Sequence, residues 1–470
     1  MHLRANVSSD PHPSTAQLAP FAAPYAADPV LQDFLHRTAD LLCSWIGSAH
    51  QHSPLPLMRP QPTIAPGTET ADIDALLNDL QVVMDGAFQP SHPGSLAHLD
   101  PPPLTASIAA ELVCAGLNNN LLADELSPGL SSLEHELCRW FCQRLGLPNG
   151  SGGVLASGGT LSNLMGLVTA RTFGVGGNNG VILCSNDAHV SLVKAVRVMG
   201  LSDDALQFLP TDSEGRLCLS AVEQRLSQLR RLNRPCLAIV ATAGTTVRGA
   251  IDLLPQLANL CRGAGIWLHV DAAIGGVFAL SAAHAPLMRG LEQADSITLN
   301  PQKLLGITKA SSLLLLRQHH QLRATFGTGL PYMENSTTGY HGGEVGLQGT
   351  RPAEVLKLWL GLRQLGEAGL ETVLSSALKR REIFANQLDS DRLRLLPGAL
   401  HLQAFHPIKG DPQSCEAWSQ QTRQQLLSAG YMLSRPFYGD RFCLKGVFGN
   451  PHTTPDHLTD LAQRINASVF

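Results

Sequence analysis

The sequence predicts an α/β protein in which a mostly parallel β-sheet is covered by helices and followed by a smaller α+β domain. Between about residues 150 and 320, short apolar runs alternate with helical patterns, which is typical of such a sheet. Beyond about residue 370, helices and strands follow that do not continue this alternation. With 470 residues, the chain is long enough for a large core and a second, smaller one.

The N-terminal part is expected to be an arm followed by helices. Residues 1–28 are rich in Ala, Pro, His and Ser without periodicity, which is typical of a flexible segment. A helical pattern at 30–49 precedes a proline-rich crossing at 54–66. Further helices are expected at 104–117, directly after three prolines, and at 130–145, where leucines recur at helical spacing.

The predicted sheet is assigned to a large domain over 91–369, between an N-terminal region at 1–90 and a small domain at 370–470. Its strands are the apolar runs 181–184, 237–241, 266–270, 296–299 and 311–316. The helices expected after the sheet are 354–366, 369–388, 414–429 and 455–466, and the late strands are 400–405 and 442–447.

Composition excludes several classes of partner. The net charge of −4 and the isoelectric point near 6.5 give no reason to expect nucleic acid or a membrane surface. No apolar run approaches the ~18–20 residues that span a bilayer, and no basic segment precedes an apolar one at the N-terminus. The ten cysteines form no CxxC pair, so buried thiols are expected rather than a metal site or disulfides. A cytoplasmic location is the expectation.

Two charged residues stand at the ends of successive predicted strands. Asp271 ends the run at 266–270, and Lys303 follows the run at 296–299, 32 positions after Asp271. Ligands of such sheets bind at the carboxyl ends of the strands, so both side chains are expected on one rim. A lysine amine forms a Schiff base with the aldehyde of pyridoxal phosphate, and a carboxylate keeps its pyridine nitrogen protonated. The pair therefore predicts a pyridoxal phosphate site.

A glycine-rich turn precedes the helix expected at 161–171. Gly159 and Thr160 lie in this turn. Glycine lets the backbone approach an anion closely, and the start of a helix supplies free amides and a favourable dipole. The turn is therefore a candidate phosphate site, although a plain tight turn would have the same sequence.

Three more residues belong to the same predicted rim. His189 follows the run at 181–184, where an imidazole can stack on an aromatic cofactor, although a lone histidine is more often an ordinary surface or core group. Thr246 follows the run at 237–241, where its hydroxyl can bind the ring oxygen or the phosphate. Asn300 precedes Lys303 and is a further cofactor-binding candidate.

A glycine-rich stretch from 327 to 349 has little periodic signal and is interpreted as an active-site lid. Tyr340 lies in this stretch and Arg351 just after it. A tyrosine on a lid can deliver a proton, and an arginine can bind a carboxylate with two hydrogen bonds. An ordinary surface aromatic is the alternative for Tyr340.

Together these segments resemble the pyridoxal phosphate-dependent group II amino acid decarboxylases. The segments are Ser-Gly-Gly-Thr, His189, Gly-Thr-Thr, His-Val-Asp-Ala-Ala and Asn-Pro-Gln-Lys, and the resemblance covers about residues 90–460. It implies fold type I, the aspartate aminotransferase-like architecture, with a mostly parallel seven-stranded sheet. It also implies decarboxylation of an L-amino acid to an amine, in a homodimer with the site at the subunit interface.

The resemblance implies roles for individual residues. Lys303 looks like the Schiff-base lysine and Asp271 like the partner of the pyridine nitrogen. His189 is similar to the histidine that stacks on the ring, with Ala273 on the opposite face. The remaining residues that resemble cofactor, lid and substrate positions are Gly159, Thr160, Thr246, Asn300, Tyr340 and Arg351.

Parts of the scaffold look most similar to L-2,4-diaminobutyrate decarboxylases. These are residues 97–103, 109–112, 127–128 and 162–167. The expected substrate is therefore L-2,4-diaminobutyrate, with glutamate, aspartate, cysteine sulfinate or an aromatic amino acid as alternatives. The positions that depart from the family's common pattern, and so affect pocket shape, are Leu161, Ile274, Gln302 and Pro352.

Other activities share this fold and cofactor. An aminotransferase would leave a keto acid rather than carbon dioxide, and other lyases cleave different bonds at the α-carbon. A desulfurase needs a reactive loop cysteine, and no cysteine lies between 327 and 351. A degenerate fold kept as a binding protein is a minor alternative, since function is argued from the site rather than the fold.

Overall fold

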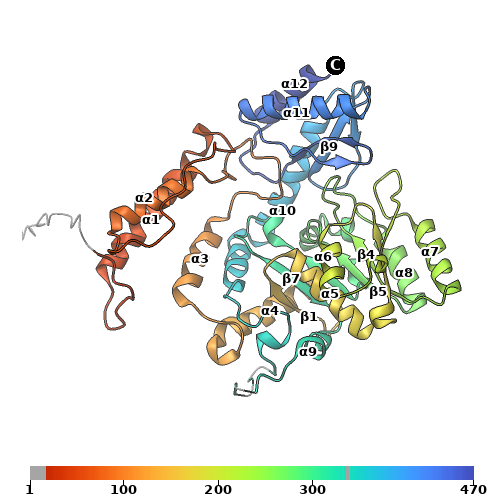
Figure 1. Cartoon of the computed structure of the whole chain (residues 1–470), viewed down its shortest axis with the longest axis horizontal. Helices are drawn as coiled ribbons and strands as arrows, with labels where there is room; N and C mark the ends of the chain where they lie inside the picture. Colours follow the sequence, from red (N-terminus) through yellow and green to blue (C-terminus); the bar gives the residue numbers. More distant parts are fainter. Residues whose placement is uncertain (1–16, 332, 335, 337–338) are drawn as a thin grey trace, which may run out of the picture.

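The computed structural model describes residues 17–470 apart from 332, 335, 337 and 338. The flexible arm is predicted over residues 1–28, and residues 1–16 of it lie outside the described part. The central sheet is surrounded by helices, and the C-terminal elements lie together at one end of it (Figure 1). Helices α1 (Pro29–Gly47) and α2 (Ile73–Asp85) project to one side, away from the sheet (Figure 1).

The central sheet has seven strands in the order β1-β7-β6-β5-β4-β2-β3. They are β1 (Gly152–Ala156), β2 (Val181–Ser185), β3 (Leu206–Leu209), β4 (Cys236–Thr242), β5 (Trp267–Asp271), β6 (Ser296–Leu299) and β7 (Ser312–Leu316). β7 runs antiparallel to both β1 and β6, and the other neighbours are parallel. The predicted mostly parallel seven-stranded sheet is confirmed.

Helices cover both faces of this sheet, which explains why its strands are continuous apolar runs. Successive side chains of a strand point to opposite faces. Leu313 and Leu315 therefore join the core that includes residues of α4 and α10, whereas Leu314 and Leu316 pack with residues of α5 and α9. The covering helices are α4 (Pro128–Arg144), α5 (Gly159–Phe173), α6 (Ser191–Val198), α7 (Leu219–Arg231), α8 (Leu254–Ala264), α9 (His320–Phe326) and α10 (Val355–Ala385).

Two strands of the sheet were missed by the sequence pattern. β1 begins with two glycines, and a Cβ at Gly153 would lie 2.4 Å from the carbonyl oxygen of Leu314 on the neighbouring strand. Close packing of strand on strand therefore decides this element, and glycine carries no apolar signal. β3 is a short, partly exposed edge strand, which also weakens its pattern.

The C-terminal part forms its own small layer of strands and helices. Its antiparallel sheet has the order β12-β9-β8, from β8 (Leu393–Leu396), β9 (Leu402–Pro407) and β12 (Leu444–Val447). A hairpin, β10 (Phe437–Tyr438) with β11 (Arg441–Phe442), and helices α11 (Pro412–Ser428) and α12 (Pro455–Ser468) complete it. The helices predicted at 354–366 and 369–388 form the single element α10, broken at Gly366, where φ is 59°.

Candidate active site

The carboxyl ends of β4, β5 and β6 and the start of α5 enclose a cavity of about 510 Å³. Asp271 is the last residue of β5, and Lys303 ends the short turn that follows β6. The residues that line the cavity include Gly159, Thr160, Asn163, Asp187, His189, Thr242, Thr246, Asp271, Ala273, Asn300 and Lys303. The structure thus brings together all the predicted cofactor-binding residues in one cavity.

The Asp271 carboxylate is 5% exposed and is held by neutral donors. Its Oδ2 accepts a hydrogen bond from Nδ2 of Asn163 at 2.8 Å, and its Oδ1 accepts one from the backbone amide of Ala273 at 3.2 Å. Neither donor neutralises the carboxylate. A negative charge in this position is suited to a cationic group in the cavity.

A buried histidine fixes the orientation of Asn163. Nε2 of His269 lies 3.0 Å from Oδ1 of Asn163, and Nδ1 lies 2.7 Å from Oγ of Ser296. Because the amide oxygen only accepts, we assign the imidazole proton to Nε2. Burial lowers the pKa of His269 to about 4, so the ring is neutral near pH 7.

Lys303 presents an amine in the same cavity. Burial lowers the pKa of this amine, and the charges of Asp271 and Asp100 oppose the shift. A lowered pKa increases the neutral fraction of the amine, which is the form that attacks an aldehyde. The local turn is closed by a hydrogen bond from the Lys303 amide to the carbonyl of Asn300 at 3.1 Å.

The start of α5 forms the opposite wall of the cavity. Gly159 is its first residue, and a Cβ there would lie 2.9 Å from the side-chain amide of Asn300. The Asn300 amide is anchored by Oγ of Ser312 at 2.7 Å. Thr160 lines the cavity next to this close approach. A helix start without a Cβ in the way is a suitable site for a phosphate.

Polar groups of the remaining wall complete the site. Nδ1 of His189 accepts a hydrogen bond from the amide of Ser191 at 3.2 Å, and burial lowers the pKa of His189. Oγ1 of Thr242 is buried and has no hydrogen-bond partner within the described part of the chain. These groups fit pyridoxal phosphate. The start of α5 is suited to its phosphate, Asp271 to its pyridinium nitrogen and Lys303 to its aldehyde.

Neither Tyr340 nor Arg351 lines this cavity. The hydroxyl of Tyr340 lies 3.2 Å from Nε2 of His319. Arg351 is buried and forms an ion pair with Glu134 at 3.0 Å. Their catalytic and substrate-binding roles stay predictions.

Sequence reasoning missed several polar residues of this region, namely Asp187 and Thr242 of the cavity lining, together with Asn163 and Lys445. Asn163 lies inside α5, where its periodic neighbours indicate only a buried helix. Lys445 lies in β12, is buried, and donates from Nζ to the carbonyl of Thr246 at 3.2 Å. Burial and the nearby charge of Lys303 lower the pKa of Lys445 to about 8. A lysine inside a buried strand was the signal that could have identified it.

Comparisons with known proteins agree with this geometry. The family model for the pyridoxal-dependent decarboxylase conserved domain matches residues 54–397. The chain is 30% identical to L-2,4-diaminobutyrate decarboxylase of Rhizobium meliloti (strain 1021), over 82% of this chain and 80% of that protein. It is 26% identical to an aromatic-L-amino-acid decarboxylase of Bacillus atrophaeus, over 80% and 81% of the two chains.

Solved structures share the fold. The crystal structure of Oryza sativa TDC with PLP and tryptamine matches with a TM-score of 0.89 at 21% identity, over 95% of this chain and 99% of that chain. Mouse CSAD in apo form matches with a TM-score of 0.86 at 22% identity, over 94% and 99%. The architecture is therefore fold type I, and the enzyme is a pyridoxal phosphate-dependent amino acid decarboxylase. This chain belongs to the pyridoxal-dependent decarboxylase family.

Proposed function

We propose that this enzyme removes the α-carboxylate of L-2,4-diaminobutyrate as carbon dioxide and leaves the corresponding diamine. The observation that carries the proposal is the 30% identity to the Rhizobium meliloti L-2,4-diaminobutyrate decarboxylase across most of both chains. A second protein of that name, from Acinetobacter baumannii, is 29% identical over 83% of this chain. Glutamate-like and aromatic amino acids are the alternatives.

The cavity contains a second carboxylate besides Asp271, which supports a substrate with two amino groups. Asp187 lines the cavity, and burial raises its pKa. Its Oδ2 accepts a hydrogen bond from the hydroxyl of Tyr438 at 2.6 Å. The carboxylate is half-buried and also feels the charge of Arg248, and an ammonium group bound there would add a direct cationic partner. We assign Asp187 to the distal ammonium of the substrate.

The proposed roles of the remaining residues follow from their chemistry. When bound, pyridoxal phosphate supplies an electron sink for the bond that breaks at the α-carbon. Lys303 would hold the aldehyde end of the cofactor through its amine, and Asp271 would hold the protonated ring nitrogen. His189 and Ala273 would contact the ring. The other cofactor-binding residues are Gly159, Thr160, Thr246 and Asn300.

Lys445 is proposed to bind the α-carboxylate of the substrate. It is a buried lysine of β12 that lies outside the lining of the cavity and is near enough to Lys303 for their charges to interact. A buried ammonium is stabilised by an anionic partner. Tyr340 or His189 is the proposed proton donor to the α-carbon, and Arg351 is the alternative partner of the same substrate carboxylate.

A homodimer is proposed as the working form. Helices α1 and α2 project from the body (Figure 1), and the segment between them exposes Leu57, Met58 and Ile64. Exposed apolar side chains on a projecting segment suit burial against a second copy. A cytoplasmic location remains proposed, and no described helix combines the length and apolar character needed to cross a membrane.

The test is release of carbon dioxide by the purified holoenzyme, with the amine product identified. The substrates are L-2,4-diaminobutyrate, ornithine, lysine, glutamate, aspartate, cysteine sulfinate, tyrosine and DOPA. The preferred substrate is expected to be L-2,4-diaminobutyrate, and Lys303→Ala is expected to abolish its turnover. Preference for an acidic or aromatic substrate would overturn the substrate proposal. Formation of a keto acid without carbon dioxide would favour an aminotransferase.

A further inference from the structure

A buried lysine of α10, Lys357, lies outside the lining of the cavity. The Lys357 side chain is 1% exposed on α10. Its Nζ pairs with Oε2 of Glu111 on α3 (Thr105–Leu117) at 2.9 Å and with the carboxylate of Glu354. Nζ also donates to the backbone carbonyl of Lys309 at 3.0 Å. This ammonium therefore has two anionic partners and one backbone partner.

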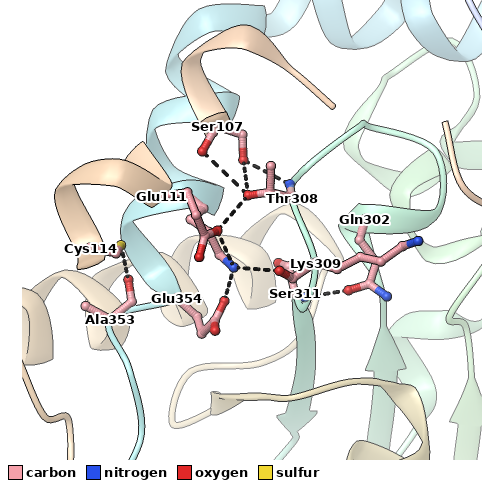
Figure 2. Close-up of polar contacts among 10 residues, drawn as sticks. Ser107, Glu111, Cys114, Gln302, Thr308, Lys309, Ser311, Ala353 and Glu354 are labelled. Carbon is pink, nitrogen blue, oxygen red and sulfur yellow. Dashed lines mark hydrogen bonds and ion pairs between the residues drawn. The ribbon is translucent and has the colours of Figure 1, made fainter. Parts of the chain in front are cut away.

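The backbone partner belongs to the loop that begins directly after Lys303. Residues 304–311 connect Lys303 to β7, and Lys309 lies near the end of this connection. Oε1 of Gln302 accepts a hydrogen bond from the amide of Ser311, which joins the two ends of the loop. Figure 2 shows Glu111, Glu354 and the Lys309 backbone converging on one point, with the Gln302–Ser311 contact beside it.

Glu111 links the same ammonium to a second point on the loop. Its Oε2 accepts a hydrogen bond from Oγ1 of Thr308 at 3.1 Å. The amide of Thr308 donates to Oγ of Ser107 at 3.0 Å (Figure 2). The loop is thus bound to α3 through Thr308 and to α10 through Lys309. The Lys357 side chain is 1% exposed and that of Glu111 is 49% exposed, so the low dielectric constant that strengthens polar contacts applies at the Lys357 end of this network.

Displacement of Lys309 would also change the charges around Lys303. The Lys309 ammonium pairs with Oδ1 of Asp100 at 2.5 Å. Asp100 is one of the two carboxylates whose charge acts on the Lys303 amine. Both the backbone that carries Lys303 and one of its neighbouring charges therefore depend on where the loop lies.

We propose that Lys357 is a positioning residue for Lys303: it holds the 304–311 loop so that the amine stays in place for attachment of the cofactor. The inference rests on the role of Lys303 in the proposed function. Loss of Lys357 leaves two carboxylates and a carbonyl without their common cation, so the loop is expected to shift. A displacement of about 1 Å in a catalytic group can cost about a hundredfold in rate.

A purely structural role for Lys357 is the competing explanation. Leu304, Leu305 and Ile307 of the same loop are buried in the main core and also anchor it. If these apolar contacts suffice, loss of Lys357 lowers stability without a specific effect at Lys303. The two explanations differ in the chemistry of Lys303 rather than in the unfolding temperature.

The experiment compares Lys357→Met with the control Arg144→Met. Arg144 also joins a carboxylate, of Glu367, and a carbonyl, of Leu280, but its side chain is 33% exposed and none of these partners belongs to the loop. Each apoprotein is mixed with pyridoxal phosphate and reduced with borohydride at timed intervals, and cofactor attached to Lys303 is measured by mass spectrometry. We expect attachment to be slowed about tenfold or more in Lys357→Met and less than about twofold in Arg144→Met.

Steady-state rates and rescue variants complete the test. We expect kcat of Lys357→Met to fall about tenfold or more while KM changes little, and Lys357→Arg to restore part of the loss. Lys357→Met combined with Glu354→Gln restores the local net charge of the parent, because one of the two carboxylates is neutralised, and is the variant to use if the single change fails to fold. Attachment at the parent rate in these Lys357→Met variants would overturn the inference. Continued attachment and turnover in Lys303→Ala would instead overturn the proposed role of Lys303.

Discussion

Asn163 and Asp271 come from a helix and a strand, and Nδ2 of Asn163 donates to Oδ2 of Asp271 at 2.8 Å. Asn163 is itself oriented by the neutral ring of His269. The Asp271 carboxylate is thereby held in one orientation and keeps its charge, because amide donors bring no net charge.

Asn163→Leu should weaken binding of pyridoxal phosphate. The substitution removes a charge-assisted hydrogen bond, worth about 1.5–3 kcal/mol, and frees the Asp271 carboxylate to rotate. The expected increase in the dissociation constant is about tenfold or more, measured by titrating the apoprotein with cofactor and following its absorbance. Asn466→Leu removes a comparable pair of hydrogen bonds in the C-terminal part and should leave this constant unchanged. Equal constants for both variants would contradict the expectation.

Substrate binding should weaken as pH rises through the pKa of Lys445, which is about 8. The protonated amine attracts the α-carboxylate, and the neutral amine does not. KM is therefore expected to be lowest below pH 8 and to rise toward tenfold per pH unit above it. Lys445→Arg keeps its charge at these pH values and should flatten this increase. The same pH profile for KM in the parent and in Lys445→Arg would argue against Lys445 as the carboxylate partner.

Arg351→Leu should destabilise the fold, because Glu134 would keep a buried charge without its cation. Removing one partner of a buried ion pair typically costs about 3–5 kcal/mol. The unfolding temperature should fall clearly, whereas the double variant Arg351→Leu with Glu134→Leu should recover part of the loss. If the unfolding temperature stays at the parent value while KM rises, Arg351 acts on the substrate rather than in the fold.

His401→Phe should make the protein less sensitive to acid. Burial, together with Arg380, Lys445 and Arg381, lowers the pKa of His401 from 6.5 to about 3. Neither ring nitrogen has a hydrogen-bond partner among the residues that the structure describes. Between these pH values, His401 is protonated in the unfolded chain and neutral in the folded chain. The free energy of unfolding therefore decreases as pH falls from 6.5 toward 3.

Between pH 7 and pH 5, His401 is expected to lower the free energy of unfolding of the parent by about 2 kcal/mol. His401→Phe should not show this decrease. Denaturant unfolding at the two pH values measures it. The exposed His36 provides the control variant, His36→Gln, which should show the same acid sensitivity as the parent. An unchanged difference in His401→Phe would show that other groups cause the acid sensitivity.

Local pattern was sufficient for most of the architecture. The runs at 181–184, 237–241 and 296–299 gave strands because buried parallel strands are continuously apolar. Asp271 and Lys303 were identified because a charge at the end of such a run is unusual. Pattern failed for β1, where glycine carries no apolar signal, and for the helix α2.

The sequence by itself determined the sheet, the rim that carries the cavity, and the positions of Asp271, Lys303 and Gly159 on that rim. Only the tertiary structure revealed that Asn163 and Lys445 belong to this region. Lys445 is far from Lys303 in the sequence, and packing brings the two lysines close enough for their charges to interact. It also decided that Tyr340 and Arg351, neighbours of the site in the predicted lid, lie outside its cavity in this chain. The physical reason is that periodicity reports which face of an element is buried. Which polar groups meet across elements depends on how those elements pack.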